Sequence, residues 1–412
     1  MNDFFQLSSP AECMDLLGSF APLASETIPL AAARERILAE TLVSQESLPP
    51  FSRSTMDGYA VRAADTFGCS ESENALLTIV GEIAMGVPGR DLTLKAGQAA
   101  RIWTGGELPQ KADAVVMVEY TQPFGQEAVA VFRPVAPEEN VIRAGEDYAA
   151  GSVVLEQGSR LRPQDLGVLS GLGITSVPVY RKPKVIILST GDELVAPDQV
   201  PPPGKIRDIN STTLTALVEE AGGIAQPLGI CIDDFEHMLA LCRENIAQAD
   251  VLLLSGGSSV GQRDFTRRVL TTIPGAELLV HGISIRPGKP TIFARLGNKA
   301  LIGLPGHVAS AQVVFTCFVR PLLRHYSGLG VNSGLVTVKA IIGQQIASVI
   351  GREDYVRVRL IPQKKDALPL AVPVYGKSGL LNPLVKADGL LPIGRDVEGL
   401  DKGVTATVLL FP

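Results

Sequence analysis

The sequence predicts a multidomain chain of the α/β plus β class, on the basis of three observations. Between residues 181 and 327, short apolar runs alternate with helical stretches, which is typical of a parallel sheet covered by helices on both faces. Before and after this region, short runs rich in valine and isoleucine are separated by glycine and proline, which indicates β structure. With 412 residues, the chain is long enough for two to four domains.

The composition argues against several classes of protein. The net charge is -6, from 37 Lys+Arg against 43 Asp+Glu, so bulk charge predicts neither a nucleic-acid partner nor an anionic membrane. Five cysteines without paired spacing and four scattered histidines favour a reducing cytoplasm over a disulfide framework or a zinc site. No signal peptide is expected at the start. The uncharged run 301–319 is interrupted by Pro305 and Gly306, so it predicts a strand, a turn and a buried helix.

Helices and a β-rich insertion are expected before the α/β region. Residues 9–12, "SPAE", have the spacing of a capping box that opens a short helix. A second helix is expected over residues 30–43. Short β runs between about residues 76 and 135 predict a small barrel or sandwich, and a helix is expected over residues 162–173.

The α/β region predicts alternating strands and helices. The expected strands are residues 184–189, 224–230 and 251–255, and the expected helices are residues 211–223, 233–248 and 264–273. After residue 328 the pattern is again that of short strands, which predicts a separate C-terminal β domain.

Three loops are expected to leave the parallel sheet at the same edge: "STGDEL" (189–194), "SGGSSVGQRD" (255–264) and "RPGKP" (286–290). A fourth loop, "GLPGH" (303–307), precedes the buried helix. Ligands on such sheets bind at the carboxyl ends of the strands. Glycine-rich turns that lead into a helix suit phosphate. Arg286 and Lys289 add two positive charges, which beside these turns favours an oxyanion site over two solvated surface charges.

Acidic residues on the same loops indicate a divalent cation. Glu193 and Asp264 fall on neighbouring loops, and Asp233 could join them; carboxylates near phosphate are typical ligands of Mg²⁺. Alternatives remain for two acids, because Asp233 also has the position of a helix N-cap and Asp192 could stabilise its own turn. The motifs "STMDGYA" and "RIWTGGELP" are each weak signals, since such turns are common.

Taken together, these motifs resemble the molybdopterin molybdenumtransferase family, whose animal counterpart is one domain of gephyrin. The motifs occur in the family's order, nearly end to end, as "STMDGYAVRAAD", "RIWTGGELP", "GED", "STGDEL", "LLLSGGSSVGQRDF", "RPGKP", "GLPGH" and "GKSGLL". The resemblance implies the last step of molybdenum-cofactor synthesis. In that step adenylylated molybdopterin and molybdate react, with a divalent cation, to give molybdenum-molybdopterin and AMP.

The resemblance also implies an elongated, L-shaped homodimer with four subdomains per chain. These are an N-terminal helical or linker domain (1–45 and 144–180), a β-rich inserted domain (46–143), a three-layer α/β molybdopterin-binding domain (181–327) and a C-terminal β-barrel (328–412). The insertion of one protomer would face the α/β domain of the other. The molybdopterin adenylyltransferase is a further expected partner, and a nucleic acid or membrane is not.

Individual positions match the family's functional residues. Catalytic positions match Asp57, Thr104, Asp147, Glu193 and Asp264. The metal, expected to be Mg²⁺, would be held by Asp233 and Asp264. The phosphates of molybdopterin would be held by Gly191, Ser255, Gly256, Gly257, Ser258 and Ser259. Molybdate, an anion that needs donors and positive charge, would be held by Arg286, Lys289, Ser310, Arg352 and Ser378.

The chain departs from the family pattern at Gln262, Gly282, His307 and Val308, which leaves a preference for tungstate over molybdate open. A non-catalytic scaffold like gephyrin is a second reading, but a scaffold needs none of the catalytic positions. The related adenylyltransferase, or a nucleotide-hydrolysing relative, is a third, but it would need neither the insertion nor the C-terminal barrel.

Overall fold

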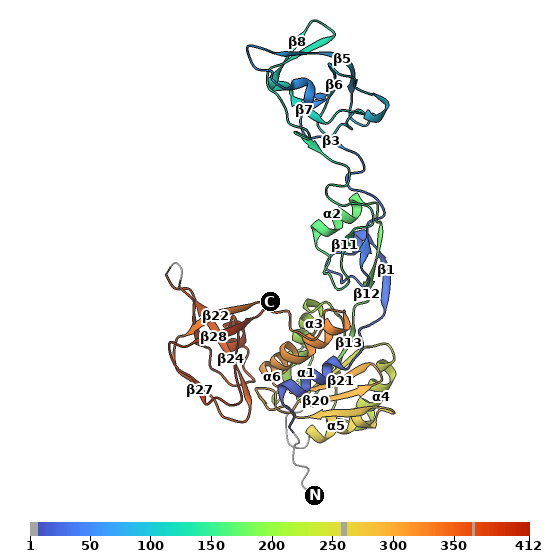
Figure 1. Cartoon of the computed structure of the whole chain (residues 1–412). Coiled ribbons are helices and arrows are strands. Elements are labelled where there is room, and N and C mark those ends of the chain that lie inside the picture. Colours follow the sequence, from blue (N-terminus) through green and yellow to red (C-terminus); the bar gives the residue numbers. More distant parts are fainter. Residues whose placement is uncertain (1–6, 257–261, 365–366) are drawn as a thin grey trace. The chain divides into compact units, whose positions relative to one another are not determined.

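The computed structural model describes residues 7–256, 262–364 and 367–412, which form two compact units (Figure 1). The larger unit contains Met1–Glu26 and Tyr180–Pro412, and the smaller unit contains Thr27–Val179. The side chains of residues 262–265 lie outside the description. Among the described residues, no helix has the length and apolar character needed to cross a bilayer.

A six-stranded sheet forms the middle layer of the α/β part of the larger unit. In spatial order its strands are β16 (Ile224–Cys231), β13 (Lys184–Thr190), β17 (Val251–Gly256), β21 (Lys299–Leu304), β20 (Ile292–Leu296) and β18 (Glu277–His281). The first four strands are parallel, as expected, and the last two run antiparallel to their neighbours. Ile292 of β20 pairs with Gly303 near the end of β21, so the loop before β20 lies at the carboxyl edge of the parallel strands.

Helices cover both faces of this sheet (Figure 1). One face carries α1 (Pro10–Gly18), α3 (Asn210–Glu220), α6 (Val308–Val314) and α7 (Arg320–Tyr326), and the other carries α4 (Phe235–Ile246) and α5 (Gln262–Thr272). Successive strand residues alternate between the faces: Val185 and Ile187 pack in the first core, and Ile186 and Leu188 pack in the second. A strand with both faces buried therefore reads as the continuous apolar run seen in the sequence.

The expected helix caps can be compared with the structure at the starts of α1 and α4. Ser9 and Glu12 form the expected capping box of α1, and Cys13 and Leu17 of that helix pack in the core of the larger unit. The expected N-cap at Asp233 is wrong, because the carboxylate of Asp234 accepts the His237 N–H at 2.7 Å and α4 begins one residue later.

The C-terminal part of the larger unit is a closed β-barrel of five strands. They are β24 (Glu353–Ile361), β25 (Leu370–Pro373), β22 (Thr337–Ile342), β28 (Thr405–Leu410) and β26 (Gly389–Ile393), and β26 pairs back with β24. The short strand β19 (Ile285–Arg286) leaves the α/β region and pairs in parallel with β24, placing Arg286 opposite Asp354. This pairing fixes the expected oxyanion loop against the barrel.

The smaller unit contains its own six-stranded sheet. In spatial order the strands are β7 (Ala114–Met117), β4 (Gly58–Val61), β6 (Gln98–Ile102), β5 (Ala75–Ile83), β9 (Ala128–Val131) and β8 (Thr121–Phe124). A separate core surrounds the expected helix α2 (Pro163–Gly171).

The helix expected over residues 30–43 is wrong. A single 3₁₀ turn spans Leu30–Ala32, a second turn with a positive φ at Glu35 follows, and Ile37 and Leu38 form isolated β-bridges before β2 (Leu42–Val43). The N–H groups of Leu38 and Ala39 donate to the carbonyls of Ser159 and Pro178 at 2.9 and 3.0 Å. Pairing with distant segments, together with full burial of Leu38, overrides the local helical preference.

Candidate active site

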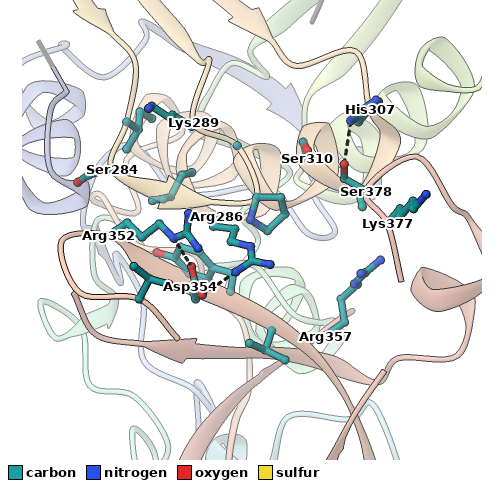
Figure 2. Close-up of a pocket in the computed structure, with 18 of the residues that line it drawn as sticks. Ser284, Arg286, Lys289, His307, Ser310, Arg352, Asp354, Arg357, Lys377 and Ser378 are labelled. Carbon is teal, nitrogen blue, oxygen red and sulfur yellow. Dashed lines mark hydrogen bonds and ion pairs between the residues drawn. The ribbon is translucent and has the colours of Figure 1, made fainter. Parts of the chain in front are cut away.

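A cavity of about 850 Å³ lies between the segment before β20, the start of α6 and the barrel (Figure 2). Every residue predicted to hold the oxyanion lines this cavity: Arg286, Lys289, Ser310, Arg352 and Ser378. These residues come from four segments that are far apart in the sequence. We call the cavity the cationic pocket.

The loop that carries Arg286 and Lys289 is tightly held. Gly288 has φ +121°, and a Cβ atom there would lie 2.7 Å from side-chain carbons of both Ile285 and Val314. Only glycine fits this close approach without a shift of its neighbours. The glycine therefore lets the two cations flank a turn that packs on β19 and α6.

One buried carboxylate organises the charges of the pocket. Asp354 is 4% exposed; its Oδ1 accepts from Arg352 Nε at 3.1 Å, and its Oδ2 lies 3.7 Å from Arg286 Nη1. It is the single carboxylate among the described lining residues, which also include the cations Arg286, Lys289, Arg352, Arg357 and Lys377. The pocket therefore has a net positive charge, which suits a small dianion.

Sequence reasoning missed two of these cations, Arg357 and Lys377. Arg357 Nη2 donates to the Gly376 carbonyl at 2.6 Å, whereas its Nη1 is buried without a hydrogen-bond partner. Burial lowers the pKa of the Arg357 guanidinium. In the sequence, an arginine inside the apolar strand "DYVRVRLI" indicates a buried cation.

His307 joins the α/β part to the barrel at the rim of the pocket (Figure 2). Its Nδ1 lies 2.8 Å from Ser378 Oγ, and the Ala309 N–H donates to the Ser378 carbonyl at 3.0 Å. This histidine is one of the departures from the family pattern, and here it contacts a predicted ligand-binding serine directly.

A second group of polar residues lies where β13, β17 and β21 end, which we call the strand-end edge. The buried carboxylate of Asp208 accepts from Ser189 Oγ and from the Ser211 N–H, both at 3.1 Å. Asn210 Nδ2 donates to Ser255 Oγ at 2.7 Å and to the Gly306 carbonyl at 2.8 Å. Sequence reasoning named Ser255 here but missed Asp208 and Asn210, although "RDINS" between a proline loop and a helix is a polar cluster.

The predicted phosphate-binding residues are only partly described. Ser255 is 1% exposed, below the surface of the edge. A Cβ atom on Gly256 would lie 2.3 Å from the Thr190 carbonyl oxygen, so the close strand pairing requires glycine. Gly257, Ser258 and Ser259 lie outside the described residues.

The predicted acids lie on the loops after β13 and β16. Gly191 has φ +151°, and a Cβ atom there would lie 2.6 Å from Glu193 Oε2. The carboxylate of Asp192 accepts the Asp233 N–H at 3.1 Å, which brings these two loops together. The backbone of Asp264 belongs to α5, and its side chain is outside the description. Within the described residues, no group of three or more His, Cys, Asp or Glu residues could hold a metal ion.

Two predicted catalytic residues meet in the smaller unit. Thr104 donates to Asp57 Oδ1 from both its backbone N–H and its hydroxyl, each at 2.8 Å. These two hydrogen bonds lower the pKa of Asp57. Asp147 is exposed, and its backbone N–H donates to the Leu48 carbonyl at 3.0 Å. No hydrogen bond joins Asp147 to the Asp57 and Thr104 pair in the described structure.

Three family models match the chain in order. The MoeA N-terminal region (domain I and II) matches residues 8–173, the "Probable molybdopterin binding domain" matches residues 186–325, and the MoeA C-terminal region (domain IV) matches residues 339–411. The molybdopterin molybdenumtransferase of Bacillus subtilis is 33% identical over 391 residues, which cover 94% of this chain and 90% of that protein. The chain belongs to the molybdopterin molybdenumtransferase family.

Other members of the molybdopterin molybdenumtransferase family agree with this assignment. The enzyme of that name from Haemophilus influenzae is 33% identical over 393 residues, 95% of each chain. A crystal structure of the molybdopterin biosynthesis MoeA protein from Pyrococcus horikoshii has a TM-score of 0.85 and 35% identity, covering 99% of this chain and 100% of that one. The expected fold is therefore confirmed, with its molybdopterin-binding domain and its C-terminal barrel.

Proposed function

We propose that this chain inserts molybdate into adenylylated molybdopterin and releases AMP, so forming molybdenum cofactor. The observation that carries the proposal is the cationic pocket, where five residues predicted to hold an oxyanion line one cavity. Family membership supports the same reaction, since relatives with about this chain's full length are named molybdopterin molybdenumtransferase.

The two reactants would bind at two neighbouring sites, the cationic pocket and the strand-end edge. In the pocket, the guanidinium and ammonium groups of Arg286, Arg352 and Lys289 would neutralise molybdate, while the Ser310 and Ser378 hydroxyls would donate hydrogen bonds. At the strand-end edge, backbone N–H groups would hold the phosphates of the organic substrate. His307 links the edge to the pocket, which would bring the two reactants near each other.

The proposal includes a divalent cation, Mg²⁺ by preference. Glu193 and Asp233 lie on loops at the strand-end edge, and the resemblance adds Asp264; such carboxylates fit a hard cation that prefers oxygen ligands. When bound, the cation would neutralise charge on the substrate's phosphates. Mn²⁺ binding, followed by electron paramagnetic resonance with AMP present, should weaken at least ten-fold in Asp264→Asn. Unchanged Mn²⁺ affinity would remove Asp264 from the ligand set.

We also propose a cytoplasmic homodimer, with the molybdopterin adenylyltransferase as the donor of substrate. The family resemblance supports this part of the proposal. Light scattering of the purified chain should give twice the mass of one chain, and a monomer at micromolar concentration would contradict it.

One assay separates the candidate functions. The purified chain is mixed with adenylylated molybdopterin, Mg²⁺ and molybdate, and the released AMP is measured. Release that requires molybdate supports the proposal, and release with tungstate at lower concentration supports a tungstate-preferring enzyme. No AMP from a folded protein would favour a scaffold. AMP release that does not need an oxyanion would favour a nucleotide-hydrolysing relative.

A further inference from the structure

The carboxylate of Asp354 is covered by two arginines of the cationic pocket (Figure 2). Its Oδ1 accepts from Arg352 Nε at 3.1 Å, and its Oδ2 lies 3.7 Å from Arg286 Nη1. The side chain of Asp354 is 5% exposed, whereas those of Arg352 and Arg286 are 35% and 60% exposed. A ligand in the pocket therefore meets the two guanidinium groups before it can reach the acid. We call these three residues the acid–arginine cluster.

The backbone brings the acid–arginine cluster together. Arg286 of β19 pairs in parallel register with Asp354 of β24. Arg352 precedes Asp354 by two residues, so the alternation of an extended chain places both side chains on one face. Glu353, between them, lines a separate cavity of about 290 Å³. The pocket thus receives one carboxylate of this strand, and each oxygen of that carboxylate faces an arginine.

The rest of the described lining offers donors to an anion. Lys289, Arg357 and Lys377 add three cations, and no second carboxylate lines the pocket in the described part of the chain. Ser310 and Ser378 can each turn a hydrogen toward an anion, because a hydroxyl rotates. A tetrahedral anion in the pocket is therefore surrounded by donors, and the one charged acceptor nearby already faces two guanidinium groups.

We propose that the acid–arginine cluster makes the pocket select oxyanions that carry no proton and reject monohydrogen phosphate. The inference rests on the proposed function, which supplies an oxyanion as the ligand of the pocket. Molybdate, tungstate and sulfate are dianions whose oxygens only accept hydrogen bonds, whereas monohydrogen phosphate has the same charge and one O–H donor. That O–H must face a cation or turn away from the lining, so phosphate loses a charge-assisted hydrogen bond. Asp354 acts through the arginines and is a positioning residue for this selectivity.

Sulfate and phosphate are matched probes of this selectivity, because both are tetrahedral and they differ by one proton. At about pH 8 inorganic phosphate is mostly the monohydrogen dianion, with the charge of sulfate. Isothermal titration calorimetry of the full chain, with molybdate displaced by each anion, measures the two Kd values. In the wild type the Kd for phosphate should exceed that for sulfate about ten-fold or more, the effect of one lost charge-assisted hydrogen bond.

Arg352→Met should remove the selectivity. It uncovers Oδ1 of Asp354, which can then accept the O–H of phosphate, while the lost positive charge weakens the binding of both anions. The ratio of the Kd for phosphate to the Kd for sulfate should fall to within about two-fold of unity. Lys377→Met is the matched control, because it removes a cation of the pocket that has no hydrogen bond or ion pair with Asp354 in the described structure. This control should weaken both anions and keep the wild-type ratio.

Arg286→Met changes a more exposed arginine and uncovers the other oxygen of Asp354, so it tests the inference even if Arg352→Met fails to fold. A purely structural role of the cluster would lower the melting temperature and weaken both anions equally, so a wild-type ratio in either folded arginine variant overturns the inference. Equal Kd values for sulfate and phosphate in the wild type also overturn it, and the proposed function then stands if AMP release requires molybdate. If the wild type binds no oxyanion, both the inference and the assignment of the pocket fail.

Discussion

At the scale of single residues, the cationic pocket depends on how Asp354 directs its neighbours. This carboxylate is buried and contacts Arg352 and Arg286, but the side chain of Arg286 remains 60% exposed. A guanidinium has five N–H groups in a fixed fork, and Asp354 faces only some of those of Arg286. The remaining N–H groups are available to an oxyanion, and the buried acid limits the number of rotamers that Arg286 adopts.

Arg286→Ala should raise the molybdate concentration needed for half-maximal AMP release by ten-fold or more. One lost charge-assisted hydrogen bond corresponds to about 1.5–3 kcal/mol, and 1.4 kcal/mol is a factor of ten. The affinity for adenylylated molybdopterin should stay nearly unchanged. Arg395→Ala, an exposed arginine of the same barrel, is the control. An unchanged molybdate dependence in Arg286→Ala would mean that the oxyanion binds elsewhere.

The Asp57 and Thr104 pair predicts a pH effect with a definite sign. The two donors from Thr104 lower the folded-state pKa of Asp57, so the stability they contribute is present above the unfolded pKa, near 4. That contribution is lost as the pH falls through the folded pKa. Thr104→Val keeps the backbone donor and removes the hydroxyl, so the pKa of Asp57 should rise, as measured by carbon NMR of the carboxyl group. A pKa that stays in place would show that the hydroxyl does not act on it.

At the scale of elements, the start of α3 connects several parts of the strand-end edge. Its first turn contacts the ends of β13, β17 and the segment after β21 through Asp208 and Asn210. The start of α4 has an ordinary cap instead, because the Asp234 carboxylate accepts the His237 N–H at an exposed position. The two helix starts therefore form a natural comparison.

Asp208→Ala should destabilise the protein more than Asp234→Ala. Loss of an exposed cap costs about 1 kcal/mol of unfolding free energy. Loss of Asp208 leaves the Ser211 N–H without its acceptor and leaves the buried Ser189 hydroxyl with Ser211 Oγ, at 2.9 Å, as its remaining partner, so a cost of about 2–3 kcal/mol is expected. Urea unfolding of the two variants and the wild type measures the difference. Equal losses would show that the Asp208 network adds nothing beyond a cap.

The elements predicted correctly are those with strong local signals. The capping box of α1, the glycine after α3 and the apolar runs of β13 and β17 are patterns within a few residues of one another. The prediction of a helix over residues 30–43 was wrong because hydrogen bonds to partners more than a hundred residues away hold that segment in a non-helical conformation. Local propensity contains no information about such partners.

At the scale of the whole molecule, the two units have separate hydrophobic cores. Three core clusters belong to the smaller unit, and the other four belong to the larger unit. Leu17 and Phe20 pack with the larger unit although the smaller unit follows them in sequence. The chain therefore leaves the larger unit after Glu26 and returns to it at Tyr180.

A fragment containing residues 27–179 should fold without the rest of the chain. Its core clusters contain only its own residues, so its apolar burial does not depend on the larger unit. Circular dichroism of the fragment should show one or two cooperative thermal transitions. A fragment without any cooperative transition would show that the smaller unit needs the rest of the chain in order to fold.

In the candidate site, as in the fold, local patterns could be predicted from the sequence and contacts between distant segments could not. Arg286, Lys289 and the acids of the loops could be named from the sequence, because turns rich in glycine and a local group of charges are visible within ten residues. Arg357 and Lys377 could not be assigned a role in this way, because closure of the barrel and the pairing of β19 with β24 bring their segments to the pocket. Asn210 could not be assigned one either, because it meets Ser255 and Gly306 only once α3 packs at the ends of β17 and β21. Periodicity and turn chemistry act between neighbours in the chain and specify elements. Hydrogen bonds such as those of Asn210 and His307 act between neighbours in space, and they exist only once the strands have packed.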